Sequence, residues 1–149
     1  MGRLAQLTSH FRIVDIGLRH CSTSGAGNGI WTLRHMTVSY VPISNGFSTA
    51  DAEMPSITYS LGKLAVHFVD WREHSVSLEF TNVNAFKWQD GTDSLVGVRD
   101  DTSYEVINSP WVAELAASNP EFANSRHFKL CFNTIGVLDV VSESIAIVA

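Results

Sequence analysis

The segment Leu64–Phe80, LAVHFVDWREHSVSLEF, decides the fold class of this chain. Its apolar residues occupy every second position on either side of a polar turn, Arg72 to Ser75: Leu64, Val66 and Phe68, then Val76, Leu78 and Phe80. A period of two predicts strands with one buried face. Two such strands around a short polar turn predict an antiparallel hairpin.

Runs of the same kind continue on both sides of this hairpin. Further strands are expected at Phe11 to Leu18, Ile30 to Val41, Val83 to Trp88, Leu95 to Val98, Tyr104 to Ile107, His127 to Phe132 and Val137 to Val148. The last run is interrupted by Ser142-Glu143-Ser144, where a bend or bulge would split it. Pro42 to Ser56 is predicted to be either a long surface loop or a loop that carries a short helical turn.

A single helix interrupts the strands. Ser109 is a favoured N-cap residue, and Pro110 suits the first helical position. An apolar stripe at helical spacing follows, and Asn119-Pro120 ends the run. We predict a helix from about Pro110 to Ser118 in a mainly β (α+β) fold, either an antiparallel β-sandwich or a strongly curved sheet.

Length and charge limit the possible functions. With 149 residues and 16.4 kDa, the chain is expected to form a single domain over residues 1–149. Charged residues make up 17%, against roughly 25% in typical domains, which favours a homo-oligomer or a face covered by a partner.

The same totals argue against two classes of partner. The net charge of −5 and the scattered basic residues predict no nucleic-acid binding. No apolar stretch reaches the roughly 20 residues of a membrane span, so no membrane partner is expected. Met1 to His10 lacks the apolar core of a secretory signal, which predicts a cytoplasmic protein. Cys21 and Cys131 are then expected to be reduced thiols.

No motif identifies a reaction. The glycine-rich segment Gly25 to Gly29 lacks lysine and leads into a predicted strand, which argues against a phosphate loop. His67, Asp70 and His74 form the tightest group of metal-ligand types, but His67 and Asp70 would face opposite sides of a strand. No G-x-S-x-G elbow occurs. We therefore assign no catalytic residue, no metal and no cofactor.

Three hypotheses for function remain open. The first is a non-catalytic module that binds a protein partner, with Asp51 and Glu53 in the Pro42 to Ser56 loop as candidate contacts. The second is a small-molecule binder with a pocket between sheet and helix, lined by Trp31, Trp88 and Trp111. The third is an enzyme in which His67, His74 or His127 converges with an acid in a cleft.

Two stretches resemble a known group of proteins. They are Val76 to Phe86 (VSLEFTNVNAF) and the tail from His127 to Ile147, and the likeness is carried by Phe80, Val83, Phe86, His127, Gly136, Leu138, Asp139 and Val140. The pattern is similar to that of small uncharacterised bacterial β-rich proteins, some of which are classed as immunity proteins of toxin systems. The resemblance implies an inhibitor that masks a partner, and an acidic inhibitor would suit a basic partner.

Overall fold

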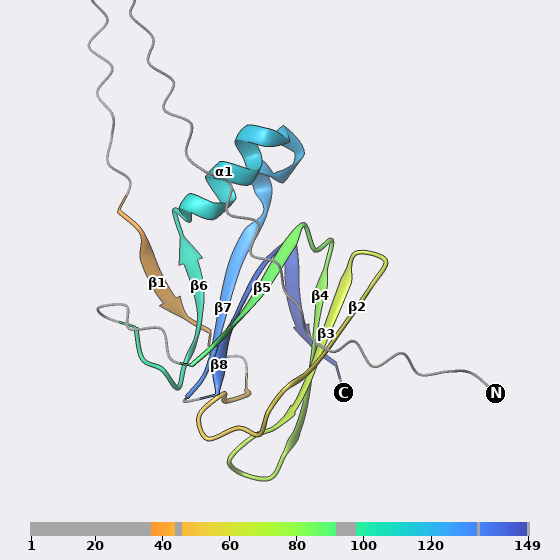
Figure 1. Cartoon of the computed structure of the whole chain (residues 1–149), viewed down its shortest axis with the longest axis vertical. Coiled ribbons are helices and arrows are strands. Elements are labelled where there is room, and N and C mark those ends of the chain that lie inside the picture. Colours follow the sequence, from red (N-terminus) through yellow and green to blue (C-terminus); the bar gives the residue numbers. More distant parts are fainter. Residues whose placement is uncertain (1–36, 44–45, 92–97, 134, 149) are drawn as a thin grey trace, which may run out of the picture. The chain divides into compact units, whose positions relative to one another are not determined.

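Two antiparallel sheets account for most of the described chain (Figure 1). The computed structural model describes residues 37–43, 46–91, 98–133 and 135–148. The five-stranded sheet has the order β1 (Ser39–Pro42), β6 (Ser103–Ile107), β7 (Arg126–Phe132), β8 (Gly136–Ser142) and β5 (Ala85–Asp90). The four-stranded sheet has the order β2 (Ser56–Ser60), β3 (Lys63–Val69), β4 (Ser75–Thr81) and β9 (Ser144–Ile147).

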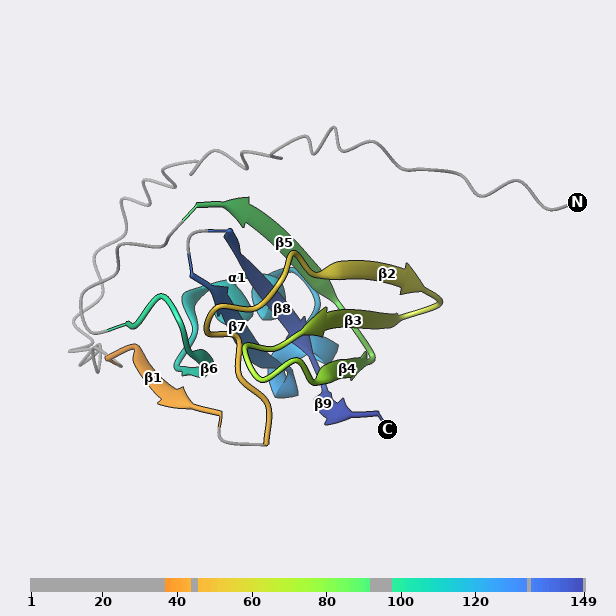
Figure 2. The same cartoon turned by 90° about the horizontal axis from the view of Figure 1, so that it is seen from below.

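The two sheets pack face to face around one apolar core (Figure 2). The four-stranded sheet contributes alternate residues of β3 and β4, and the five-stranded sheet contributes alternate residues of β7 and β8. The fully buried members include Leu64, Val66, Leu78, Phe80, Phe128, Leu130, Phe132, Leu138 and Val140. The predicted mainly β fold is confirmed, and of its two forms the molecule adopts the sandwich.

The predicted helix is confirmed as α1 (Pro110–Ser118). The Ser109 side chain accepts the backbone N–H of Val112 at 3.3 Å, as an N-cap does. A 3-10 helix, η1 (Pro120–Asn124), follows at once, and the two helices together connect the neighbouring strands β6 and β7. Neither helix of the described chain is long and apolar enough to cross a membrane.

The break predicted in the C-terminal run separates two strands of different sheets. β8 pairs with β5 and β7, whereas β9 pairs with β4. Glu143 makes the transition, and its backbone N–H donates to the Thr81 carbonyl at 3.1 Å. The interruption is therefore the point at which the chain crosses from one sheet to the other, rather than a bulge within one strand.

The sequence patterns missed one strand. β2 lies at the edge of its sheet, and Ile57 is its only residue that is not exposed, so it shows little alternation of apolar residues. Of the strand predicted at Ile30 to Val41, residues 37–41 are described, and the strand β1 begins within them at Ser39. The strand predicted at Phe11 to Leu18 and the Gly25 to Gly29 segment lie outside the described residues. A single domain over residues 1–149 stays a prediction.

The sandwich core predicts a large contrast between two identical substitutions. Leu130 is fully buried between the sheets, whereas Leu61, in the β2–β3 turn, is 99% exposed. Leu130→Ala should lower the free energy of unfolding by about 2–5 kcal/mol, and Leu61→Ala by less than about 0.5 kcal/mol. Urea denaturation of both variants measures the difference, and equal losses would contradict the assigned core.

Candidate functional site

A row of charged side chains crosses the face of the five-stranded sheet that points away from the core. Asp139 on β8 lies directly between Lys87 on β5 and Lys129 on β7, because both lysines are its register partners. The Nζ atom of Lys129 is 3.2 Å from Oδ1 and 3.3 Å from Oδ2 of Asp139. The Nζ atom of Lys87 is 3.8 Å from Oδ2. Opposite charges on neighbouring strands stabilise such a row.

A chain of hydrogen bonds links this row to helix α1. The Nε2 atom of His127 lies 2.9 Å from Oδ1 of Asp139, and its Nδ1 atom lies 2.8 Å from Oγ of Ser109. A carboxylate can only accept, so Nε2 carries a proton. In the neutral ring Nδ1 then accepts from the Ser109 hydroxyl, which itself accepts the N–H of Val112. Each donor and acceptor in this series of hydrogen bonds then has a partner.

Asp139 is ionised in the folded protein. Burial by itself would raise the pKa of its carboxyl group, but the hydrogen bond from His127 and the charges of Lys129, His127 and Lys87 outweigh it and lower the pKa below the ordinary value of 3.8. An ionised carboxylate that is only 4% exposed is costly unless it is paired. The network around Asp139 supplies this pairing.

A cavity of about 300 Å³ opens beside the network, where α1 meets the sheet. Trp111 contributes to its wall, with its ring edge-on to His127 at a centroid separation of 5.3 Å. The Nζ atom of Lys87 lies 4.9 Å from the centre of the Trp111 ring. The remaining lining residues are Val38, Tyr40, Gln89, Val106, Ser109, Pro110, His127, Lys129 and Asp139. Apolar walls with a few convergent polar groups are typical of small-molecule sites.

The order Ser109, His127, Asp139 is that of a proton relay, but its surroundings favour binding over catalysis. The Ser109 oxygen is already the cap of α1, and Ser109 and His127 are each only 7% exposed. Two ammonium groups also offset the negative charge of Asp139, which in a catalytic triad stabilises the protonated imidazole. The network therefore fixes α1 to the sheet and presents charged groups to the cavity.

The three tryptophans predicted to line a pocket do not come together in the described structure. Trp111 lies on the cavity, next to His127. Trp88 is on the opposite face of the sheet, where it packs on Phe132 at 5.9 Å and its indole N–H donates to Asp90 at 2.7 Å. Trp31 lies outside the described residues. Of the three, Trp111 alone is brought to the cavity within this part of the chain.

The two acidic candidates lie in the loop between β1 and β2. Asp51 has a φ of 46° and accepts a hydrogen bond from the Asn133 side chain at 2.6 Å. The side chain of Glu53 is exposed, and its backbone N–H donates to the Val69 carbonyl at 3.0 Å. Thr49 of the same loop is buried. The loop is tied to the sandwich at these points, and none of its described residues lines the cavity.

His67, Asp70 and His74 form no common site. His67 on β3 is exposed and contacts Ser77 at 2.8 Å through Nδ1. Asp70 is buried in the β3–β4 turn, where it accepts the N–H groups of Arg72 and His74 and pairs with the Arg72 guanidinium. Within the described ranges, no group of three or more His, Cys, Asp or Glu side chains is arranged to hold a metal ion.

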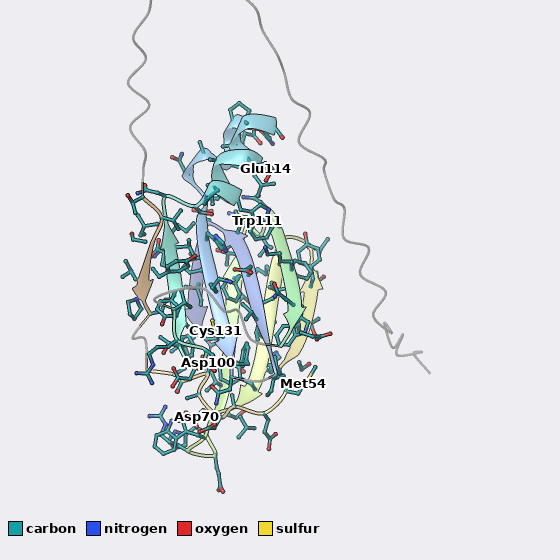
Figure 3. The ribbon with its side chains drawn as sticks, turned by 60° about the vertical axis from the view of Figure 1, so that its left-hand side comes forward. Met54, Asp70, Asp100, Trp111, Glu114 and Cys131 are labelled. Carbon is teal, nitrogen blue, oxygen red and sulfur yellow. The ribbon has the colours of Figure 1, made fainter. Side chains whose placement is uncertain are left out.

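Large exposed apolar side chains are scattered over the described surface. Leu61 lies in the β2–β3 turn and Trp71 in the β3–β4 turn, at opposite ends of β3. Figure 3 shows Asp70, the neighbour of Trp71, at the end of the sandwich opposite to Trp111 and Glu114. Leu61 and Trp71 therefore do not belong to one apolar docking surface.

A second, wider hollow of about 570 Å³ lies near η1. Its polar side chains hydrogen-bond to one another: Asn82 donates to Glu143, and Asn84 donates to Ser125 at 2.7 Å. Among the described residues, no ion pair lies in its lining. The cavity at α1 is the stronger candidate site.

Sequence patterns could have identified part of this network. The hairpin predicted around Asn133 to Gly136 brings Lys129 and Asp139 onto neighbouring strands, and the structure pairs them directly because Phe132 lies opposite Gly136. His127 and Asp139 are among the residues that carry the resemblance described above. There they indicate a shared fold and do not predict that the two side chains form one network. The contribution of Lys87 and Tyr40 was missed, because their strands pair with strands that are distant in the sequence.

No protein-family model matches this chain, and no curated protein or solved structure is significantly similar to it.

The hydrogen bonds of Ser109 predict an effect beyond the loss of a helix cap. Ser109→Ala removes the acceptor for Val112 and leaves Nδ1 of His127 without its partner. The free energy of unfolding should fall by about 1–3 kcal/mol. Ser118→Ala, in the exposed last turn of α1, is the matched control and should change it by less than about 0.5 kcal/mol. Similar values for both variants would contradict the assigned link.

The charge of Asp139 predicts a change in acid stability. Because its folded-state pKa lies below 3.8, ionised Asp139 stabilises the fold above this pH, and the contribution disappears as the pH falls through the lower folded-state value. Asp139→Asn should cost about 3–5 kcal/mol near neutral pH, since it leaves a broken buried ion pair. The difference from the native protein should shrink as the pH falls below 3.8.

Urea denaturation at a series of pH values measures this difference. Glu114→Gln, on the exposed side of α1, is the control and should follow the native protein at every pH. A loss for Asp139→Asn that stays constant down to the most acidic pH would show that the charge of Asp139 does not contribute.

Proposed function

We propose that this protein is a small-molecule-binding domain whose ligand enters the cavity between α1 and the five-stranded sheet. The observation that carries the proposal is the buried Lys129–Asp139–His127 network at the wall of that cavity. Buried ion pairs contribute little to stability, because apolar residues of similar volume serve the fold equally well. Their presence beside a cavity points to a role in recognition.

The composition of the cavity supports the same conclusion. Trp111 offers an aromatic surface, Val38, Val106 and Pro110 offer apolar contacts, and Lys87 and Gln89 supply polar groups from the edge strand β5. A volume of about 300 Å³ is at the lower end of the range for small-molecule pockets, roughly 300–1,000 Å³. This space suits a ligand of one or two rings.

Binding to a protein partner, as an immunity-type inhibitor or otherwise, stays a prediction from the sequence. The net charge of −5 is the feature that favours it, since it would speed association with a basic protein. The scattered exposed apolar residues offer it less support than the cavity offers a small ligand. A homo-oligomer and a cytoplasmic location likewise stay predictions.

The proposal predicts ligands whose binding depends on Trp111. The test is a thermal-shift screen of the full chain with one- and two-ring fragments of neutral, cationic and anionic character. At least one fragment class should raise the melting temperature, because a ligand of the folded state stabilises it. Trp111→Ala should remove this shift. The control Trp71→Ala, in a residue that is 60% exposed in the β3–β4 turn, should retain it.

Circular dichroism checks that both variants fold, and Trp111→Phe provides a milder change if Trp111→Ala does not. The proposal fails if no fragment raises the melting temperature. It also fails if the shifts persist in both Trp111 variants.

A further inference from the structure

The strand β2 forms an edge that is open to pairing with another strand. Unprotected backbone N–H and C=O groups of an edge strand are a template for such pairing. The other edges of the described sheets carry protection: β1 and β9 have only four residues, β1 ends at Pro42, and β5 carries Lys87 and Asp90. β2 has five uncharged residues without proline, and it lies at the outer margin of its sheet (Figure 1).

The backbone of β2 offers free hydrogen-bonding groups at alternate residues. The turn between β2 and β3 has two residues, both with positive φ, 48° and 78°, as in a type I′ hairpin. Such a turn is closed by a hydrogen-bonded pair, here Ser60 and Lys63, and bonded pairs alternate with non-bonded ones along the strands. Thr58 is therefore bonded to β3, whereas the N–H and C=O groups of Ile57 and Tyr59 point to the free edge.

The bonding of β3 to its other neighbour gives the same assignment. The Asp70 N–H donates to the His74 carbonyl at 2.9 Å, just beyond the paired part of β3 and β4. Since the residues of a middle strand bond alternately to its two neighbours, the even-numbered residues of β3 bond to β4 and the odd-numbered ones to β2. Thr58 is the register partner of the odd-numbered Ala65.

The sequence of β2, Ser-Ile-Thr-Tyr-Ser, is complementary to itself about Thr58. In a two-fold interface, a surface meets a second copy of the same surface. Antiparallel pairing about Thr58 sets Ile57 opposite Tyr59 of the second copy, and Thr58 opposite its own counterpart. Pairs of β-branched with aromatic residues, and Thr–Thr pairs, are favourable across strands. The Ile57–Tyr59 pairs are also those whose backbone groups point to the edge.

The same pairing covers exposed apolar side chains. Met54, Tyr59 and Leu61 are each more than half exposed. Met54 precedes one end of β2 and Leu61 follows the other end, so an antiparallel partner brings Leu61 of one copy towards Met54 of the other. The Tyr59 ring already lies 5.4 Å from that of Phe86 on the core side of the sheet. Removing this apolar surface from water favours association.

We infer that two copies of this chain form a symmetric dimer in which their β2 strands pair antiparallel about Thr58. The two four-stranded sheets then join into one continuous sheet across the two-fold axis. An interface made by one edge strand is small, so the dimer should dissociate on dilution. The inference is independent of the proposed function, because no residue of β2 lines the cavity at α1.

Sedimentation equilibrium of the full chain between about 1 μM and about 1 mM tests the inference. The average mass should rise from that of one 16.4 kDa chain towards twice this value. Thr58→Lys and Thr58→Glu, at an exposed position, each set like charges opposite one another and should weaken association at least about tenfold. An equal mixture of the two variants should associate again, since opposite charges then face each other.

Ala146→Lys is the matched control, because Ala146 is also exposed and lies on β9, at the other edge of the same sheet. This variant should associate as the native chain does, and circular dichroism checks that all variants fold. A single-chain mass at every concentration overturns the inference. Association that survives both Thr58 substitutions, or that is lost in Ala146→Lys, overturns it as well, and so does a mixture of the two Thr58 variants that stays monomeric.

Amide hydrogen exchange of the native chain supplies a test without substitutions. The N–H groups of Ile57 and Tyr59 should exchange at least about tenfold more slowly in concentrated than in dilute solution, because only the dimer gives them acceptors. Exchange rates that do not change with concentration would show that no second copy pairs with β2.

Discussion

Strand β8 is buried along its whole length, and the middle of it carries a carboxylate. An ionised Asp139 in this position must be compensated by nearby groups, because an isolated buried charge costs many kcal/mol. The register of the sheet provides Lys129 on one side and Lys87 on the other. His127 adds a hydrogen bond to Asp139 through Nε2, and its Nδ1 atom forms a second hydrogen bond with Ser109. Because Ser109 is the N-cap of α1, the hydrogen bonds that compensate Asp139 also attach the start of this helix to the sheet.

The two faces of the five-stranded sheet serve different purposes. One face buries Phe128, Leu130, Phe132, Leu138 and Val140 against the four-stranded sheet, and this apolar packing supplies the stability of the sandwich. The other face holds the charged row and the cavity. Because neighbouring residues on a strand point to opposite faces, β7 and β8 supply both functions from alternate positions. A charged site can thus be placed on the central strands without weakening the core.

Helix α1 forms the wall of the cavity without being part of the core. None of its residues is fully buried, so its position depends on the Ser109 cap, the hydrogen bond to His127 and the contact of Trp111 with the His127 ring. An element held by few buried contacts opens at low cost in free energy.

The elements that local sequence decides were predicted well. The β3–β4 hairpin, β7 and the interruption at Glu143 follow from apolar periodicity, and the bounds of α1 follow from Ser109, Pro110 and Asn119-Pro120. These signals are short-range, because the period of two and the helix caps involve residues a few positions apart. β2 escaped notice because an edge strand with little burial needs no such period.

The contacts of the candidate site also fall into those that local sequence determines and those that depend on the tertiary structure. The sequence by itself determined that Lys129 and Asp139 lie on neighbouring strands, since a short turn around Asn133 to Gly136 joins β7 and β8 into a hairpin. The sequence also determined that Ser109 caps α1. Only the tertiary structure placed Lys87 beside Asp139, packed Trp88 against the core and brought Trp111 to His127. The order of strands distant in the chain is chosen by the burial of whole sheet faces, and no local pattern records that choice.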